Sequence, residues 1–421
     1  MPPIAVPEIP HPGRVTELRA LWVSRFDWTE EGTRPADRTR LDRIVEEAAA
    51  AGFNVLLFQV RAMADAYYAS TLEPWAARVS GRGLGRAPEP FWDPLAYLLA
   101  KAHAAGLQVH AWLNVYPVAE GRDRCLQNPD WRVQPLPLFY RLAVAHGVTF
   151  NKVNGLQWDD RGEVLCTGYR YASPASPVFE EHFLAVAAEL AANYAVDGLH
   201  LDHVRYAGRR ASCDPVSLRR YYGLPEEAPL PPCRLDAAYA DWQRGLISTT
   251  VRRVYREVAQ PHALWLSAAV WPVYRRFPEL DRFGPSSQGY HDYYQDSKTW
   301  AQEGYIDALM PMIYPAIYHC PDDSFWNREV WRLLVADFQA TAGQRLIIPG
   351  IGTGYCTFDE IADRIDMARA LGVAGHALFS YRGLAARNYF TELAAGPYAT
   401  PAAVPSLPWR QGIRLPALRR W

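Results

Sequence analysis

Asp202 is the carboxylate whose position in this sequence most favours chemistry. It lies in the run DGLHLDHVRY (residues 197–206), whose first six residues are expected to form a buried strand that ends at the acid. A carboxylate at the tip of a strand can stabilise the positive charge that develops on a sugar ring when a glycosidic bond breaks. We therefore expect Asp202 to act as a nucleophile or as an electrostatic stabiliser.

Further polar and aromatic side chains lie at the ends of other expected strands. Alternate residues of a strand share a face, so these side chains can meet at one mouth. In chain order they are Arg25 and Asp27, Gln59 and Arg61, His110, Trp112 and Asn114, His200 and Asp202, Trp271, and Tyr314. The alternative is that some form buried pairs, with Arg61 and a nearby carboxylate as one such pair. Paired charges are costly in a core, so this concentration favours a site.

Glycosidic cleavage also needs a second acid, and Asp65 is the candidate acid/base partner because it follows the second strand. Asp296 precedes a helix and suits an N-cap better. A metal site built from His110, His200 and His203 with Asp202 is the alternative chemistry. His203 has the opposite strand parity to His200 and Asp202, so we expect neither a metal nor another cofactor.

Eight short apolar runs alternate with amphipathic helical stretches and would position these residues. The expected strands are 20–27, 54–61, 107–114, 197–202, 264–270, 306–314, 346–351 and 375–381; expected helices include 38–51, 94–105, 177–194, 237–258 and 358–371. Eight βα units close most simply as an α/β (β/α)₈ barrel, with an open doubly wound sheet as the alternative. Long connections follow strands three and four, at 116–177 and 205–235, and long loops are usually functional.

The predicted organisation is an N-terminal extension (1–16), the barrel (17–395) and a Pro-rich tail (396–421). A net charge of -1 gives no broad attraction to nucleic acid, and no apolar run approaches a membrane span of about 20 residues. The 15 Trp and 24 Tyr residues fit a large core, which composition alone favours, or sugar stacking. Trp112, Tyr116, Trp271 and Tyr314 are the expected stacking residues.

Six cysteines fall in expected loops without the CxxC spacing of a zinc site. We expect the disulfides Cys125–Cys166, Cys213–Cys233 and Cys320–Cys356, which form in an oxidising compartment. The protein is then periplasmic, cell-wall-associated or secreted. The alternative is a cytoplasmic location, because residues 1–15 lack the pattern of a signal peptide.

Several stretches resemble the glycosyl hydrolase-like family 10. They are ELRALWV (17–23), FNVLLFQVR (53–61), DAYY (65–68), LEPW (72–75), GLQVHAWLN (106–114), DGLHLD (197–202) and PMIY (311–314). The resemblance implies a barrel glycosidase acting on a bacterial envelope or extracellular polysaccharide, and one type of relative trims peptide-free peptidoglycan strands. His203 is a departure, because many relatives carry a second Asp at that position.

The primary hypothesis is hydrolysis of O-glycosidic bonds in an amino-sugar polymer, with peptidoglycan glycan as the expected substrate. Arg25, Gln59, Arg61, Asn114 and Arg205 would orient the carboxylates or bind hydroxyl, acetamido or lactyl groups, while Asp27, His110 and His200 would line the site. The polysaccharide is the only partner expected. The rival hypotheses are a non-catalytic carbohydrate-binding barrel, and a metal-dependent hydrolase or deacetylase.

Overall fold

A single parallel sheet forms the centre of the computed structural model, which describes residues 15–30, 34–120, 137–149, 152–165, 167–315, 325–354 and 357–410. Its strands run in the order β12-β11-β10-β9-β4-β3-β2-β14-β13. Their bounds are β2 (Leu18–Val23), β3 (Val55–Arg61), β4 (Gln108–Asn114), β9 (Gly198–Asp202), β10 (Trp265–Val270), β11 (Ala308–Pro311), β12 (Leu346–Ile347), β13 (Gly350–Gly352) and β14 (Gly375–Phe379).

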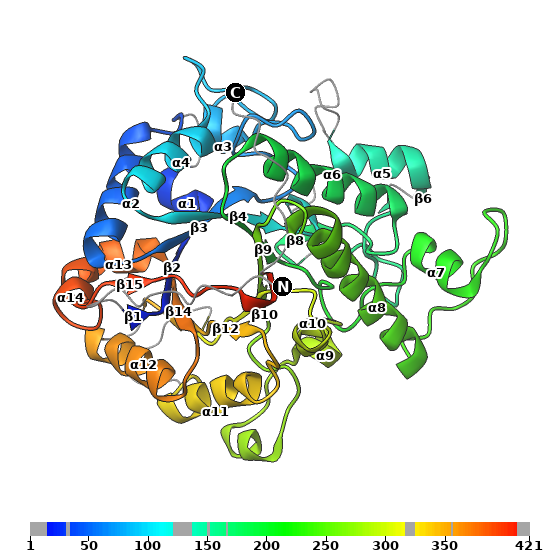
Figure 1. The fold of residues 1–421 in the computed structure, drawn as a ribbon. Coiled ribbons are helices and arrows are strands. Elements are labelled where there is room, and N and C mark those ends of the chain that lie inside the picture. Colours follow the sequence, from blue (N-terminus) through cyan, green and yellow to red (C-terminus); the bar gives the residue numbers. More distant parts are fainter. Residues whose placement is uncertain are drawn as a thin grey trace, which may run out of the picture.

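The sheet closes because β12 and β13 are two parts of one strand, separated by Ile348 and Pro349. The Ile348 amide donates to the Leu309 carbonyl on the β11 side (2.9 Å), and the Ala377 amide of β14 donates to the Pro349 carbonyl (3.0 Å). The strands therefore surround a central axis, which Figure 1 views end-on. The expected (β/α)₈ barrel is confirmed, and the open doubly wound sheet is wrong.

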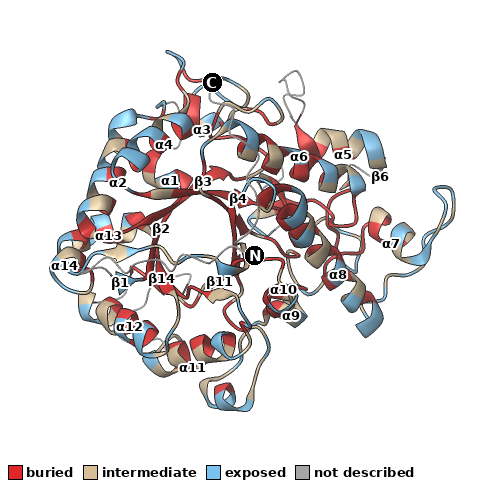
Figure 2. Cartoon of the chain, in the orientation of Figure 1, coloured by how far each residue is buried: buried red, intermediate tan, exposed pale blue. Residues whose placement is uncertain are grey.

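Helices pack around the barrel and bury one face each, as the red inner and blue outer surfaces in Figure 2 show. Asp37, Ser176 and Asp236 accept hydrogen bonds from first-turn amides and so begin three of the helices. The principal helices are α2 (Arg38–Ala51), α4 (Pro94–Ala104), α6 (Pro177–Asn193), α8 (Ala237–Arg253, continued as a π-helix over Val254–Ala259), α10 (Ser297–Gln302), α11 (Arg328–Gln339), α12 (Phe358–Ala370), α13 (Tyr381–Arg387) and α14 (Tyr389–Ala395).

The first strand ends at Val23, four residues earlier than expected. Ser24 begins the helical turn α1 (Arg25–Trp28), and Asp27 closes a capping box by accepting from the Ser24 amide and hydroxyl. The sixth and eighth strands are also shorter than expected. Local capping chemistry therefore overrides the apolar pattern at the end of the first strand.

The C-terminal tail covers the amino end of the barrel. β15 (Ala402–Ala403) pairs in parallel with β1 (Val15–Thr16), and Val404 and Leu407 pack against the apolar cluster inside the barrel. Trp409 Nε1 then donates to Asp307 Oδ1 at the start of β11 (2.7 Å). Because this end is occupied, the carboxyl ends of the strands are left for a site, as is usual for this fold.

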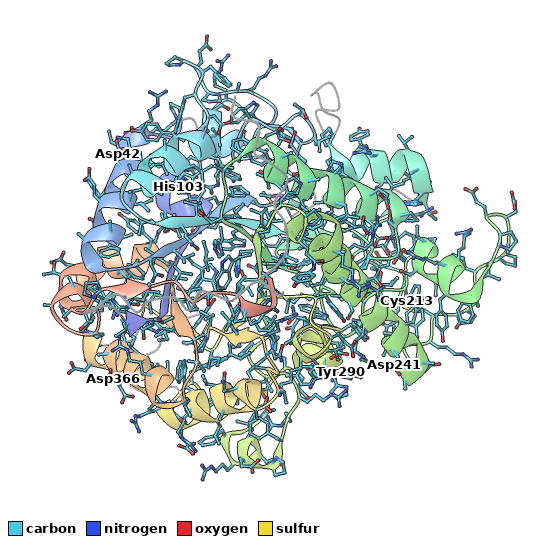
Figure 3. The ribbon with its side chains drawn as sticks, viewed as in Figure 1. Asp42, His103, Cys213, Asp241, Tyr290 and Asp366 are labelled. Carbon is cyan, nitrogen blue, oxygen red and sulfur yellow. A yellow bond between two sulfur atoms is a disulfide. The ribbon has the colours of Figure 1, made fainter. Side chains whose placement is uncertain are left out.

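Two insertions rise from the carboxyl ends of β4 and β9. The first includes α5 (Leu138–His146) and the antiparallel pair of β5 (Pro117–Glu120) and β8 (Tyr169–Tyr171). The second includes α7 (Pro215–Tyr222) and is closed by the Cys213–Cys233 disulfide, which confirms that expected bridge; Figure 3 labels Cys213. The other two expected bridges involve Cys125, Cys166, Cys320 and Cys356, which lie outside the described residues.

None of the helices in the described part of the chain is both long enough and apolar enough to cross a membrane.

The buried pair of Arg61 and Glu73 gives a stability prediction. Both side chains are at most 1% exposed, and His182 Nε2 lies 3.0 Å from Glu73 Oε1. Although burial would raise the pKa of Glu73, Arg61 and His182 hold it at about 2. Its stabilisation is therefore complete above pH ~4.5 and is lost as the pH falls towards 2.

We expect Glu73→Gln to lower the free energy of unfolding by about 3–5 kcal/mol at pH 7, because it leaves Arg61 as an uncompensated buried charge. Urea titration measures this change. Glu329→Gln is the control, because its pair with Arg332 is exposed and should contribute less than about 1 kcal/mol. Equal losses in the two variants would contradict the prediction.

Candidate active site

Asp202 lies where expected, at the carboxyl end of β9, directly beside Asn114 of β4 in the parallel register. It is 7% exposed, and its Oδ1 accepts from the His203 amide (2.6 Å) and from Arg205 Nη1 (3.4 Å). Burial raises the pKa of this carboxyl, but His203 and Arg205 outweigh burial and bring it below its ordinary value. Asp202 is therefore ionised at neutral pH, as a nucleophile or a stabiliser of positive charge requires.

A second network joins four of the expected residues on the neighbouring strand ends. Gln59 Oε1 accepts from the backbone amide (3.0 Å) and Nη1 (3.2 Å) of Arg25. Asn114 Oδ1 accepts from Gln59 Nε2 (3.3 Å) and from Trp112 Nε1 (3.0 Å). These bonds fix Asn114 beside Asp202, so the network supports the wall of the site next to the carboxylate.

Tyr169 connects the two groups, although nothing in the sequence singled it out. Its hydroxyl accepts from Arg25 Nη2 (3.0 Å), and its ring centroid lies 5.3 Å from that of His203. Tyr171, likewise not singled out by the sequence, lies 2.7 Å from His203 Nδ1 through its hydroxyl oxygen. Both belong to β8, which the antiparallel pairing with β5 returns to the mouth. The one signal for them was the abundance of aromatics in the long 116–177 connection.

Trp271 and Tyr293 form a partly exposed aromatic pair beside Arg205, the residue that donates to Asp202. Their ring centroids are 4.0 Å apart, and the Arg205 guanidinium lies 5.4 Å from the Trp271 ring. Such rings match the apolar faces of pyranoses. Tyr314 packs against the apolar cluster inside the barrel, and its ring stacks on that of Phe379 with the centroids 5.0 Å apart. Sugar stacking by Trp271 and Tyr314 stays a prediction, and Tyr293 was not foreseen.

Three expected substrate-binding residues do not reach the mouth, which corrects their assignment. The register shift between Gln59 and Arg61 turns Arg61 outward, where it binds Glu73. Asp27 caps α1, as described above. Tyr116 is fully buried and directs its hydroxyl to Thr250 Oγ1 (3.0 Å). All three therefore have structural roles.

His110 and His200 lie inside the barrel rather than at its mouth, which corrects a further expectation. Both are 0% exposed. His200 Nε2 must accept from Trp22 Nε1 (3.0 Å), so its neutral ring donates through Nδ1 to Ser267 Oγ (2.9 Å). Burial lowers the pKa of His200 to about 3 and that of His110 to about 4. Both rings are neutral core components.

Asp65 lies in the turn after β3, where its Oδ1 accepts from the Met63 amide (2.7 Å) and the Ala62 amide (3.3 Å). It is 6% exposed, and burial raises its pKa despite the nearby charge of Arg25. A raised pKa suits a proton donor. Asp296 precedes α10 as expected but makes no capping bond; its Oδ1 accepts from the Tyr274 hydroxyl (2.6 Å).

Across the described ranges, no group of three or more His, Cys, Asp and Glu side chains is arranged to hold a metal ion.

A family model described as glycosyl hydrolase-like 10 matches residues 17–321. The chain belongs to this family. It is similar to glycosyl hydrolase YngK of Bacillus subtilis (strain 168), at 23% identity over 435 residues that cover 96% of this chain and 76% of that protein. Glycosyl hydrolase DigH of Escherichia coli (strain K12) is 26% identical over 324 residues, which cover 70% of this chain and 65% of that protein. The family match and these relatives confirm the expected enzyme class, a glycosidase.

Solved structures support the barrel. The PgaB (BpsB) glycoside hydrolase domain from Bordetella bronchiseptica aligns with a TM-score of 0.61 at 14% identity, covering 90% of this chain and 98% of that domain. Alpha-L-fucosidase isoenzyme 2 from Paenibacillus thiaminolyticus aligns with a TM-score of 0.56 at 14% identity, covering 92% of this chain and 49% of that one. At these identities the likeness concerns the fold.

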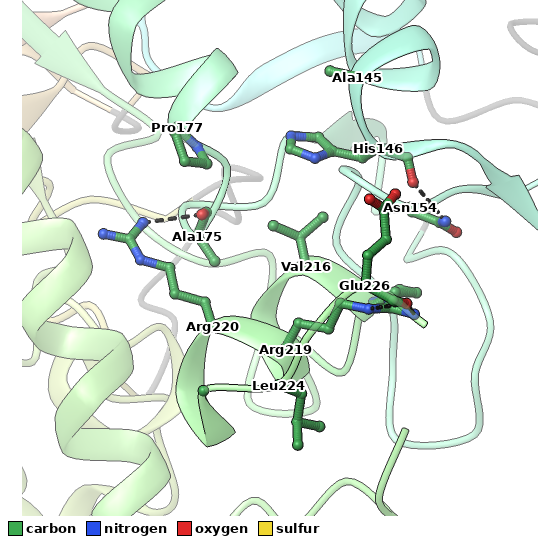
Figure 4. Close-up of a pocket in the computed structure, with 12 residues that line it drawn as sticks. Ala145, His146, Asn154, Ala175, Pro177, Val216, Arg219, Arg220, Leu224 and Glu226 are labelled. Atoms are coloured by element: carbon green, nitrogen blue, oxygen red, sulfur yellow. Dashed lines mark hydrogen bonds between the residues drawn. The ribbon is translucent and has the colours of Figure 1, made fainter. Parts of the chain in front are cut away.

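A separate surface pocket of about 550 Å³ lies outside the barrel (Figure 4). It is lined by α5, by the start of α6 and by α7, with His146, Arg219, Arg220 and Glu226 among its side chains. None of the residues around Asp202 lines it, so it is distinct from the mouth.

The buried histidines predict a pH dependence of stability. His110 is protonated in the unfolded chain below pH ~6.5 but resists protonation in the folded barrel until about pH 4. Folding is therefore penalised as the pH falls through this window, by about 2 kcal/mol at pH 5.

We expect His110→Leu to lose less stability than the wild type between pH 7.5 and pH 5, as measured by urea unfolding at both pH values. Leu carries no titratable group, and the described residues offer neither ring nitrogen of His110 a hydrogen-bond partner. Parallel acid profiles for the two proteins would contradict the neutral core role.

Proposed function

We propose that the protein hydrolyses O-glycosidic bonds of a bacterial envelope or extracellular amino-sugar polysaccharide, with peptidoglycan glycan strands as the substrate. The observation that carries this proposal is the ionised carboxylate of Asp202 at the carboxyl end of β9, bound to Arg205, which in turn lies beside the Trp271–Tyr293 pair. Family membership supplies the reaction class. The proposed polymer rests on the family resemblance described above, because one type of relative trims peptide-free peptidoglycan strands.

Asp202 is proposed as the key carboxylate, acting as nucleophile or electrostatic stabiliser. Its charge is retained because Oδ1 accepts from the His203 amide and from Arg205. These donors also orient the carboxylate, leaving Oδ2 to face the sugar. A fixed anion beside the sugar ring stabilises the oxocarbenium-like transition state without reorganisation.

Asp65 is proposed as the acid/base partner. Burial raises the pKa of Asp65, as a proton donor at neutral pH requires. Arg25, whose charge acts on Asp65, also donates to the Tyr169 hydroxyl on the Asp202 side of the mouth. Gln59, Asn114 and Arg25 would then hold this wall in place rather than bind substrate directly, since their side chains bond mainly to one another.

An extracytoplasmic location is also proposed. The Cys213–Cys233 disulfide supports it, because disulfides persist in oxidising compartments and are rare in the cytosol.

The test is incubation of the wild type, Asp202→Asn and Asp65→Asn with peptide-free peptidoglycan strands and other amino-sugar polymers, with new reducing ends read by mass spectrometry. We expect product from the wild type and a loss of turnover of about 10³-fold in Asp202→Asn. Asp65→Asn should lose activity mainly towards substrates with poor leaving groups, which depend on proton donation.

Asp197→Asn is the matched control. Asp197 lies next to the other end of the same strand, where its side chain accepts from the Val109 amide (2.8 Å), so this variant should retain turnover. Product from Asp202→Asn at the wild-type rate would contradict the proposal. Binding of a polymer without product from any protein would instead support a carbohydrate-binding barrel.

A further inference from the structure

The ring of His203 is fixed beside Asp202 from several directions. Its backbone lies in the left-handed region (φ 48°), which His adopts more readily than most residues and which is often found at functional sites. The ring centroid lies 5.3 Å from that of Tyr169 and 5.9 Å from that of Tyr171. The strained backbone thus turns the side chain to the Asp202 side of the mouth, and two aromatic rings restrict its orientation.

The partners of Nδ1 determine where the ring carries its proton. Arg205 Nη2 lies 3.3 Å from this nitrogen, and the Tyr171 hydroxyl lies 2.7 Å from it. A guanidinium can only donate, so Nδ1 must accept, and the proton of the neutral ring lies on Nε2. Burial raises the pKa of Tyr171, so its hydroxyl keeps its proton and is able to donate to Nδ1.

The charges around the ring favour its neutral form. Burial is the main cause, and Arg205 and Arg25 add to it, so the pKa of His203 falls to about 4 although Asp202 acts in the opposite direction. Protonation would place a hydrogen on Nδ1 against the Arg205 guanidinium, which can only donate. The titratable and charged groups that face the ring are Asp202, Arg205, Arg25, Tyr169 and Tyr171.

The Nε2–H group lies beside the carboxylate without bonding to it. Nε2 is 4.0 Å from Asp202 Oδ2, which is beyond hydrogen-bonding distance, and the His203 side chain is 19% exposed. An oxygen atom of a sugar that approaches Oδ2 would come within reach of the same N–H. The site therefore presents a fixed anion and a fixed neutral donor side by side.

We propose that His203 is a neutral hydrogen-bond donor, through Nε2–H, to a hydroxyl or acetamido oxygen of the sugar that Asp202 faces. Arg205 and Tyr171 are positioning residues that select this tautomer. The proposal deepens the proposed function and rests on it.

The tautomer is tested directly, without any activity measurement, by NMR of wild-type protein labelled with ¹⁵N-histidine. The resonances of His203 are assigned by their loss in His203→Asn. We expect an unprotonated Nδ1 and a protonated Nε2 from pH 8 down to about pH 5, and movement of the Nε2–H resonance when a peptide-free glycan oligosaccharide is added. A protonated Nδ1, or a resonance unaffected by bound oligosaccharide, would overturn the proposal.

The donor role is tested by a pair of variants. The side-chain amide of His203→Gln can occupy the position of Nε2, whereas that of His203→Asn reaches only the position of Nδ1. We expect His203→Asn to lower kcat/KM about ten-fold, mainly through KM, and His203→Gln to recover most of this loss. Equal losses in both variants would overturn the donor role. If the wild type proves inactive, the same comparison is made on the oligosaccharide Kd, so failure of the proposed function and failure of this inference remain distinguishable.

Discussion

The parallel pairing of β9 with β4 on one side and β10 on the other is the constraint on which the site depends. This pairing places Asp202 opposite Asn114 and brings His200 beside Ser267. Gly198 makes it possible, because a Cβ at this position would lie 2.8 Å from both the His110 Cγ and the Trp265 Cβ. A larger residue would force the barrel interior apart and move the end of β9 that carries Asp202.

The charged side chains of this molecule fall into two groups, those buried in the barrel away from the site and those at its mouth. Arg61 and Glu73 form a buried ion pair at the carboxyl end of β3, and Glu17 binds Arg19 and Arg369 at the amino end of β2. The histidines inside the barrel stay neutral because burial opposes their protonation. The charge of Asp202 at the mouth is therefore set by its immediate neighbours, chiefly Arg205 and the His203 amide.

The repeating pattern of apolar runs and helices was sufficient to predict the barrel and the place of Asp202, because both depend on periodicity along the chain. Helix α2 matches its expected bounds for the same reason. The rule that alternate residues of a strand share a face gave a wrong prediction for Arg61. A register shift, which no local pattern indicates, turns its side chain outward. The same rule gave a wrong prediction for Asp27, because the Ser24 capping box ended the strand before this residue. Tyr169 and Tyr171 could not be predicted, since they reach the site only through the pairing of β8 with β5, about fifty residues away in the chain.

The most direct test of the central claim is a crystal structure of Asp202→Asn with a peptide-free glycan oligosaccharide. The glycosidic bond should lie against residue 202, with one sugar face on the Trp271–Tyr293 pair and a sugar oxygen hydrogen-bonded to His203 Nε2. An oligosaccharide bound elsewhere, as in the pocket between α5 and α7, with the barrel mouth empty, would contradict the assignment of the site.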